Sequence, residues 1–239
     1  MILNSLLSIH SVLEGEAGRD ACLRTVNFMS YELAATCASR NDESALSELN
    51  NFFFEKKSFR IGSDNFLPQQ IVEERTGCGV ALSLLYMHLA QGLGLNLELV
   101  HWPLHSLLKW DQGGRSRFVD MERKGKLLSE DEILGLINKH KGEVRTLPLS
   151  EALVEYLSHL SVYFRLQKNN ECLLKTLSLI LDQEPENTRV LVERALLRRE
   201  MGFPKEALND LKRYFAFADK SAVAPEVLTA YDELRSLTL

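Results

Sequence analysis

The stretch "RTGCGVALSLLYMHLAQGLGL", Arg75 to Leu95, decides the fold. From Val80 onward its apolar residues return at helical spacing, and Gly92 and Gly94 are typical of a helix end. The expected helix begins at Cys78, which stands between two glycines. A thiol at that point is either an activated nucleophile or a small apolar residue in a tight turn. The two interpretations predict different functions.

The chain before this stretch is predicted to be helical. Helices are expected over about 1–14 and 17–38, and a third opens near residue 42, where Asp42 or Ser44 could cap it. A short helix over 69–75 is expected to end at Gly77.

The chain after this stretch changes to a strand-like pattern. Residues 95–102 alternate apolar and polar side chains, and the segments 105–111 and 116–122, joined by "QGG", predict a hairpin. This is the only convincing β-structure in the sequence. From Leu128 the pattern is helical again, apart from the linker-like segment 141–150.

Composition excludes several classes of function. Hydrophobic residues make up 45%, charged residues 26%, and the net charge is −5 with a pI near 5.8. No basic run occurs, so neither nucleic acid nor an anionic membrane is an expected partner. The N-terminal stretch lacks the features of a signal peptide, and the four cysteines are scattered without C-x-x-C spacing. We therefore expect a cytoplasmic protein with reduced thiols.

Around Cys78 the sequence offers a candidate catalytic group. A helix N-terminus favours an anion and can lower the pKa of a thiol. His105 and Asp120 lie on the two arms of the predicted hairpin, where they can be cross-strand neighbours, so His105 could act as base and Asp120 could orient it. The amide of Gly79 could serve as oxyanion donor. In the alternative interpretation Cys78 packs as a small core residue and the histidine and aspartate tie two strands together.

Other chemistry is weakly supported. His101 could line the same cleft, but a lone histidine on a half-buried strand is more often structural. No phosphate-binding loop is present, and the histidines do not make a metal site. We expect neither a metal nor an organic cofactor. The aromatic residues near the hairpin are predicted to form the core around the sheet: Tyr86, Trp102, Trp110 and Phe118.

The C-terminal part shows a weak internal period of 34 residues, which resembles the tetratricopeptide repeat. In this frame Gly202 lies in a turn between two helices and Ala207 lies where helices must approach closely. The charges within 192–200 are expected to form a solvated face laced with salt bridges; the alternative is a concave face that binds a peptide. Two repeats rarely stabilise themselves, so they should dock on the domain before them.

The region from about 59 to 133 resembles the transglutaminase-like core of a bacterial family of invasion-regulator-type proteins, in which tetratricopeptide repeats follow the core. The segments that carry the resemblance are "ERTG" (74–77), "ALSLLYMHLAQGLGL" (81–95), "VHWPLH" (100–105), "FVD" (118–120) and "KGKLLSEDEI" (124–133). The resemblance implies a papain-like order of thiol, imidazole and carboxylate.

The chain departs from that family at the site itself. Active transglutaminase-like enzymes place their nucleophile fifteen residues before the glycine that ends the helix, which is Gly79 here and not Cys78. A shift of one residue turns a side chain by roughly 100° around a helix. Ser106 stands where the family usually has phenylalanine. These departures favour a lost enzymatic site.

The sequence thus predicts a mostly helical α+β protein. Residues 1–145 should hold the N-terminal helices and a transglutaminase-like (papain-like) core with a small antiparallel sheet, and 146–239 tetratricopeptide-like helices. The expected function is a catalytically vestigial regulator or adaptor that binds a protein or peptide through the repeats or the cleft. The alternative is an active cysteine protease or acyl (amide) transferase with a Cys78–His105–Asp120 triad.

Overall fold

The computed structural model describes the chain except for residues 38–40, 63–64, 103–105, 141–144, 219–222 and 238–239, and gives no side-chain description for 136–140. The chain forms two compact units, Met1–Tyr156 and Leu157–Leu239. The sequence had placed the division at 145/146. No described helix is long and apolar enough to cross a membrane.

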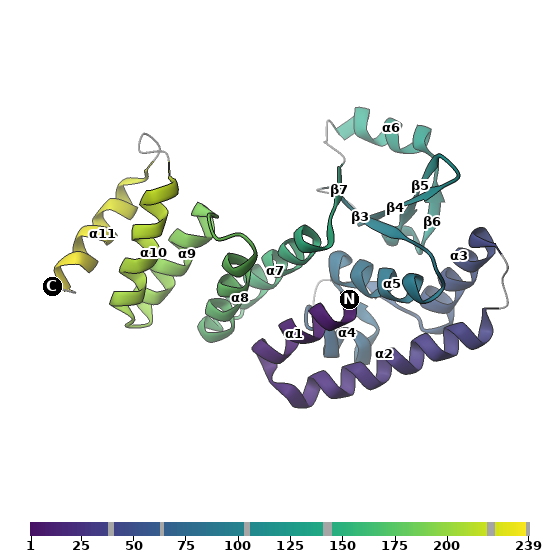
Figure 1. Ribbon diagram of the computed structural model, residues 1–239, viewed down its shortest axis with the longest axis horizontal. Helices are drawn as coiled ribbons and strands as arrows, with labels where there is room; N and C mark the ends of the chain where they lie inside the picture. Colours follow the sequence, from purple (N-terminus) through teal and green to yellow (C-terminus); the bar gives the residue numbers. More distant parts are fainter. Residues whose placement is uncertain (38–40, 63–64, 103–105, 141–144, 219–222, 238–239) are drawn as a thin grey trace. The chain divides into compact units, whose positions relative to one another are not determined.

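The first unit combines helices with two sheets (Figure 1). Its helical elements are α1 (Ile2–Glu14), α2 (Glu16–Thr36), α3 (Asp42–Asn50), the π-helix η1 (Asn51–Lys56), α4 (Pro68–Glu74), α5 (Gly79–Gly92), the short 3-10 helix η2 (Met121–Arg123) and α6 (Glu130–His140). Its strands are β1 (Arg60–Ile61), β2 (Thr76–Gly77), β3 (Leu97–His101), β4 (Leu107–Gln112), β5 (Arg115–Asp120), β6 (Lys126–Leu128) and β7 (Arg145–Leu147).

Two helix boundaries differ from the sequence prediction. Helix α3 is capped by Asn41, whose side chain accepts a hydrogen bond from the amide of Ser44 at 2.9 Å, and not by Asp42 or Ser44. Helix α4 ends at Arg75, which adopts φ of 60°, and not at Gly77. At α3 the Asn41 side chain satisfies a free amide of the first turn, whereas at α4 the left-handed backbone of Arg75 ends the helix and its amide donates to the carbonyl of Ile71 at 3.0 Å.

Helix α5 is confirmed, with Cys78 as its N-cap. Its C-terminal end forms a Schellman motif, because the amide of Gly94 donates to the carbonyl of Gln91 at 3.1 Å and that of Leu95 to Ala90 at 3.0 Å. Gly94 has φ of +79°, which explains why glycine occupies this position.

The main sheet has five antiparallel strands in the order β6-β5-β4-β3-β7. The predicted hairpin is confirmed: β4 and β5 are joined by Gly113 and Gly114, whose φ angles of 57° and 83° suit a two-residue turn. The prediction missed the edge strands β6 and β7. Each has three residues, too few to show alternation, and β7 lies in the segment expected to be a linker.

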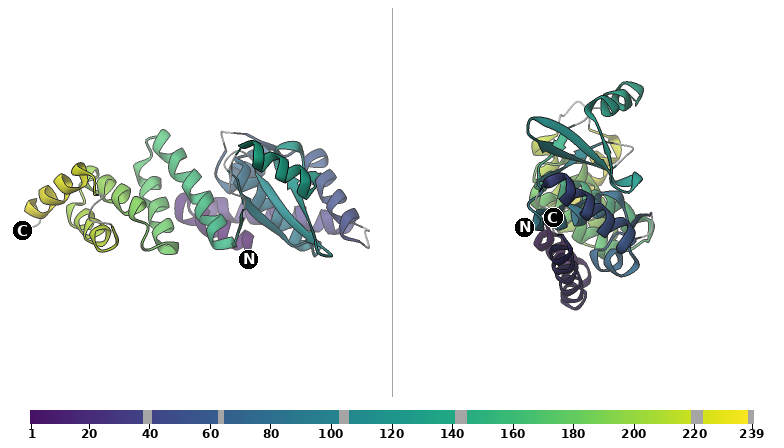
Figure 2. Two further views of the ribbon diagram at one scale, coloured as in Figure 1. Left: turned by 90° about the horizontal axis from the view of Figure 1, so that it is seen from above. Right: turned by 90° about the vertical axis from the view of Figure 1, so that its right-hand side faces the viewer.

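The two faces of this sheet pack against different helices, α5 on one side and α6 on the other (Figures 1 and 2). Val100, Leu107 and Phe118 share one face and cluster with Ile133 of α6. Because side chains alternate along a strand, Leu99, Leu108 and Val119 point to the opposite face. This division determines which polar groups face α5.

An aromatic cluster beside α5 forms much of the core of this unit. Phe53 stacks on Phe59 at 4.4 Å between ring centroids and meets Tyr86 edge-on at 5.2 Å. The hydroxyl of Tyr86 donates to Asn50 Oδ1 at 2.7 Å. Tyr86, Trp102, Trp110 and Phe118 are all buried, as predicted.

The second unit is helical in its described residues. It begins within α7 (Leu149–Leu166) and continues through α8 (Asn170–Gln183), α9 (Thr188–Glu200), α10 (Pro204–Phe217) and α11 (Pro225–Leu237). Gly202 lies in the turn between α9 and α10 with φ of +82°, and Ala207 is fully buried where α10 packs on α9.

The charged segment 192–200 is not a uniformly solvated face, which corrects the sequence expectation. Arg194 is buried and donates from Nε and Nη2 to both carboxylate oxygens of Asp210, at 3.0 and 2.7 Å. Arg198 adds a third hydrogen bond to Asp210 at 2.6 Å. A buried carboxylate on α10 attracts these arginines, and the period of the sequence alone did not reveal it.

Candidate functional site

Cys78 lies at the start of α5 but is closed off from solvent. Its side chain is buried, with 7% of the residue exposed. Its backbone amide donates to the carbonyl of Asn65 at 3.1 Å, which fixes the chain just before the helix. The position is the one predicted, and the burial agrees with the interpretation of Cys78 as a packed residue.

Burial also sets the chemistry of this thiol. It raises the pKa of Cys78 to about 11, and the nearby amides of Ala81 and Cys78 itself oppose the rise without cancelling it. At pH 7 only on the order of one thiol in ten thousand is then ionised. The thiolate is the reactive form, so this environment does not activate Cys78 as a nucleophile.

The space beside the Cα atom of Gly79 is occupied and not open. A Cβ atom at this position would lie 1.8 Å from Oγ and 2.8 Å from Cβ of Ser106. The side chain of Ser106 therefore occupies the place where a nucleophile at position 79 would begin.

Asp120 is buried at the end of β5 and has local partners. Its carboxylate accepts from the amide of Arg123 at 3.2 Å and lies 3.5 Å from Nε of the same residue. In the sheet Asp120 is opposite Leu107, so it shares the face that packs on α6. Ser106, one residue before Leu107, points to the other face, toward α5. The carboxylate caps the turn at η2.

His105 lies outside the described residues. Whether its imidazole joins Cys78 and Asp120 therefore stays a prediction. The described members of the predicted triad, Cys78 and Asp120, are on α5 and on the α6-facing side of the sheet.

His101 has a carboxylate partner that the sequence did not indicate. Its Nδ1 lies 3.1 Å from Oε2 of Glu155 on α7. The histidine side chain keeps 46% of its surface exposed and the glutamate 27%. The two residues are 54 positions apart, so no local pattern could have paired them.

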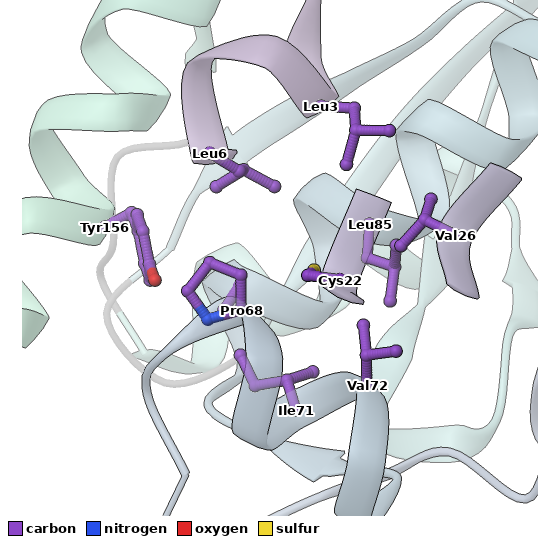
Figure 3. A pocket seen from close by; sticks show the side chains of 10 residues that line it. Leu3, Leu6, Cys22, Val26, Pro68, Ile71, Val72, Leu85 and Tyr156 are labelled. Carbon is purple, nitrogen blue, oxygen red and sulfur yellow. The ribbon is translucent and has the colours of Figure 1, made fainter. Parts of the chain in front are cut away.

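An apolar pocket of the first unit is lined by residues of α1, α2, α4, α5 and α7 (Figure 3). Its cavity volume is about 20 Å³. Burial raises the pKa of Cys22 in its wall to about 11, and the hydroxyl of Tyr156 is engaged with the carbonyl of Phe66 at 2.6 Å. These groups do not make a catalytic centre. The pocket is lined by Leu3, Leu6, Cys22, Val26, Pro68, Ile71, Val72, Ala81, Leu85 and Tyr156.

Within the part of the chain that the structure describes, no group of three or more histidine, cysteine, aspartate or glutamate residues is placed to hold a metal ion. All four cysteines fall in that part, and none is in a disulfide.

Comparison with known proteins identifies the fold family of the core. Residues 20–168 match the family model described as the transglutaminase-like superfamily. The match covers more than half of the chain and includes α5 and the five-stranded sheet.

Individual relatives are distant. The chain is 29% identical to F-box only protein 21 of Pongo abelii over 168 residues, which is 65% of this chain and 27% of that protein. It is 26% identical to the Homo sapiens protein of the same name over 219 residues, 84% of this chain and 33% of that protein. It is 24% identical to a UPF0162 protein of Xylella fastidiosa over 188 residues, 71% of this chain and 66% of that protein. The chain thus spans a third or less of the length of F-box only protein 21.

Proposed function

Because this chain belongs to the transglutaminase-like superfamily, we propose that it keeps the fold of these enzymes without their thiol chemistry. It acts instead by binding a protein or peptide, as a regulator or adaptor. The observation that carries the proposal is the state of Cys78, which is buried at the helix start with its pKa raised to about 11. Ser106 supports the same conclusion, because its side chain occupies the space that a nucleophilic side chain at position 79 would need.

The helical unit supports a binding role, because its helix boundaries recur at the repeat length seen in the sequence. Helices α7 and α9 end 34 residues apart, at Leu166 and Glu200. Helices α8 and α10 likewise begin 34 residues apart, at Asn170 and Pro204, and both have 14 residues. A 34-residue pair of helices is the tetratricopeptide period, and such repeats commonly receive peptides.

The setting we propose is cytoplasmic, since the cysteines carry thiols and not disulfides. A regulatory role of the kind implied by the resemblance to bacterial invasion-regulator-type proteins fits with the bacterial relative from Xylella fastidiosa. The relatives' own names state no partner, so the partner is defined here only as a protein or peptide.

The alternative is an active cysteine hydrolase or acyl (amide) transferase. Cys78 would be the nucleophile, His105 the general base, Asp120 the orienting group and the Gly79 amide an oxyanion donor. What favours it is the position of Cys78 as N-cap of α5 in a transglutaminase-like fold. This alternative requires a reactive thiol at Cys78, whereas the binding function does not.

Photo-crosslinking tests the binding function on the full chain. A photoreactive amino acid replaces Leu166 on α7 in one variant and Tyr31 on α2 in another; the two native residues are 77% and 73% exposed. We expect the same cellular protein to be crosslinked reproducibly at Leu166 and not at Tyr31. Equal capture at both positions, or no specific adduct at Leu166, would contradict binding through the repeat unit.

A further inference from the structure

Arg75, at the end of α4, is a cation that pairs with no carboxylate among the described residues. Its guanidinium lies over the ring of Phe59, 5.1 Å from the ring centroid, and Nη1 donates to Sδ of Met29 at 3.3 Å. A thioether is a weak acceptor, and the other guanidinium donors have no hydrogen bond to a described residue. The side chain is only partly exposed, so its charge is held in one orientation without being neutralised.

The two carboxylates that precede Arg75 in the chain are held by other residues. Glu73 accepts a hydrogen bond from Nε2 of Gln69 at 2.8 Å. Glu74 accepts one from Nδ2 of Asn65 at 3.0 Å. Neither glutamate forms an ion pair with Arg75, so the neighbouring sequence supplies no counter-charge.

Two lysines surround the carboxylate that does act on Arg75, which is Glu32 of α2. Nζ of Lys57 donates to Oε2 of Glu32, and Nζ of Lys56 lies 3.8 Å from Oε1. Glu32 and Met29 are one helical turn apart on α2, which brings Glu32 toward the guanidinium. Burial lowers the pKa of Arg75, and the charge of Glu32 opposes this effect. Three cations therefore share one carboxylate.

This group carries a surplus of positive charge and is partly open to solvent. Three cations and one carboxylate leave two positive charges uncompensated, in a chain whose net charge is −5. The side chains of Lys56 and Lys57 are 47% and 17% exposed, and that of Glu32 is 23% exposed. A phosphate monoester carries about two negative charges near neutral pH, so its charge matches the surplus.

We propose that Arg75, Lys56 and Lys57 bind a phosphate monoester. The guanidinium of Arg75 presents its free donors as a fork to two phosphate oxygens, a geometry that lysine cannot offer. The two lysines contribute point charges, and Glu32 limits the affinity because it repels the anion. The site lies wholly in the first unit, so the inference goes beyond binding through the repeats and does not depend on it.

Nuclear magnetic resonance of the full chain tests the site with two probes. Glycerol phosphate represents a small ester, and a neutral glycine–serine peptide with one phosphoserine represents a modified protein. Each is titrated at constant ionic strength, with potassium chloride as the blank. We expect the Nε–H signal of Arg75 and the backbone amides of Lys57 and Ser58 to shift and saturate with at least one probe and not with chloride. The probe that binds more tightly identifies the source of the phosphate group.

Substitutions separate this site from a general attraction of anions. Arg75→Gln should raise the dissociation constant about tenfold or more, because charge-assisted hydrogen bonds to the phosphate are lost. Glu32→Gln should lower it about threefold or more, because the competing carboxylate is removed. Arg19→Gln is the matched control: Arg19 is also on α2 but pairs with Glu16 and Asp20, so the constant should not change.

Circular dichroism establishes that each variant is folded. The proposal is overturned if no signal near Arg75 saturates with either probe, or if Arg19→Gln weakens binding as much as Arg75→Gln does. If Arg75→Gln does not fold, Glu32→Gln decides alone, and binding no tighter than that of the unaltered chain overturns the proposal. None of these results bears on the crosslinking at Leu166, which tests the other unit of the chain.

Discussion

Gly125, in the turn before β6, is subject to two independent constraints. Its φ of +76° is one that other residues adopt at a cost, and a Cβ atom there would lie 1.9 Å from Oδ1 of Asn50. Asn50 cannot easily move, because Oδ1 accepts from Tyr86 and Nδ2 donates to the carbonyl of Gly125 at 2.9 Å.

We expect Gly125→Ala to lower the free energy of unfolding by about 2–4 kcal/mol, from backbone strain plus overpacking. Gly114→Ala is the matched control, since Gly114 has φ of +83° but no atom within 4 Å of an added Cβ. It should cost only the strain, about 1–2 kcal/mol. Urea unfolding of the two variants measures these changes. Equal losses of unfolding free energy would show that the Asn50 side chain moves aside without cost.

His10 on α1 is buried, with 1% of the residue exposed, and neither ring nitrogen has a hydrogen-bond partner. Burial lowers its pKa below the ordinary value of 6.5, and the carboxylate of Glu14 opposes this less strongly. Between the two pKa values the unfolded chain binds more protons than the folded chain. The free energy of unfolding should therefore fall as the pH drops below about 6.5.

Urea titrations at pH 7.5 and 5.5 measure this effect. One such proton contributes at most about 1.4 kcal/mol per pH unit. The loss at pH 5.5 should be smaller in His10→Gln and unchanged in His159→Gln, whose native histidine is exposed. Burial lowers the pKa of His88 in the same direction, so part of the loss should persist in both variants. If His10→Gln loses as much unfolding free energy between pH 7.5 and 5.5 as the unaltered chain, His10 does not cause the pH dependence.

At the scale of elements, α9 and α10 are joined by a largely buried ion pair. The side chains of Arg194 and Asp210 are 9% and 2% exposed. Removing one member of a buried pair leaves the other charge without compensation, which costs far more than breaking an exposed pair.

Asp210→Ala should therefore destabilise the helical unit by about 3–5 kcal/mol. Glu233→Ala, which breaks the half-exposed pair with Arg199 between α9 and α11, should cost about 1 kcal/mol or less. Hydrogen exchange locates the effect: amides of α9 and α10 should lose protection in Asp210→Ala, whereas those of α5 should keep theirs. Similar losses of stability in the two variants would mean that the buried pair stabilises the unit no more than the exposed pair does.

The long elements could be predicted from the sequence because their own residues specify them. Helix α5 carries its apolar stripe and its terminal glycine, and the hairpin β4–β5 carries alternation and a Gly-Gly turn. Elements that depend on distant partners could not be predicted. The three-residue strands β6 and β7 exist because sheet edges offer them hydrogen bonds, and the parallel pair β1–β2 has only two residues a strand.

At the scale of the whole molecule, the transglutaminase-like core was predictable because its motifs are local, and the family match over 20–168 agrees with that prediction. Less of the candidate site could be predicted from the sequence. The pairing of His101 with Glu155 and the approach of Ser106 to Gly79 both join residues that only the fold brings together. Burial of Cys78 was one of two alternatives that the sequence left open, and the structure places its side chain among buried residues.

The central claim is that the thiol of Cys78 is protonated and inaccessible. The most direct test is the rate at which iodoacetamide alkylates each of the four cysteines in the native protein at pH 7, read by peptide mass spectrometry. Cys78 should react as slowly as the buried Cys22 and Cys172, and more slowly than the partly exposed Cys37. Alkylation of Cys78 at least ten times faster than the other three, at a pH well below 8, would contradict the account and establish a cysteine enzyme.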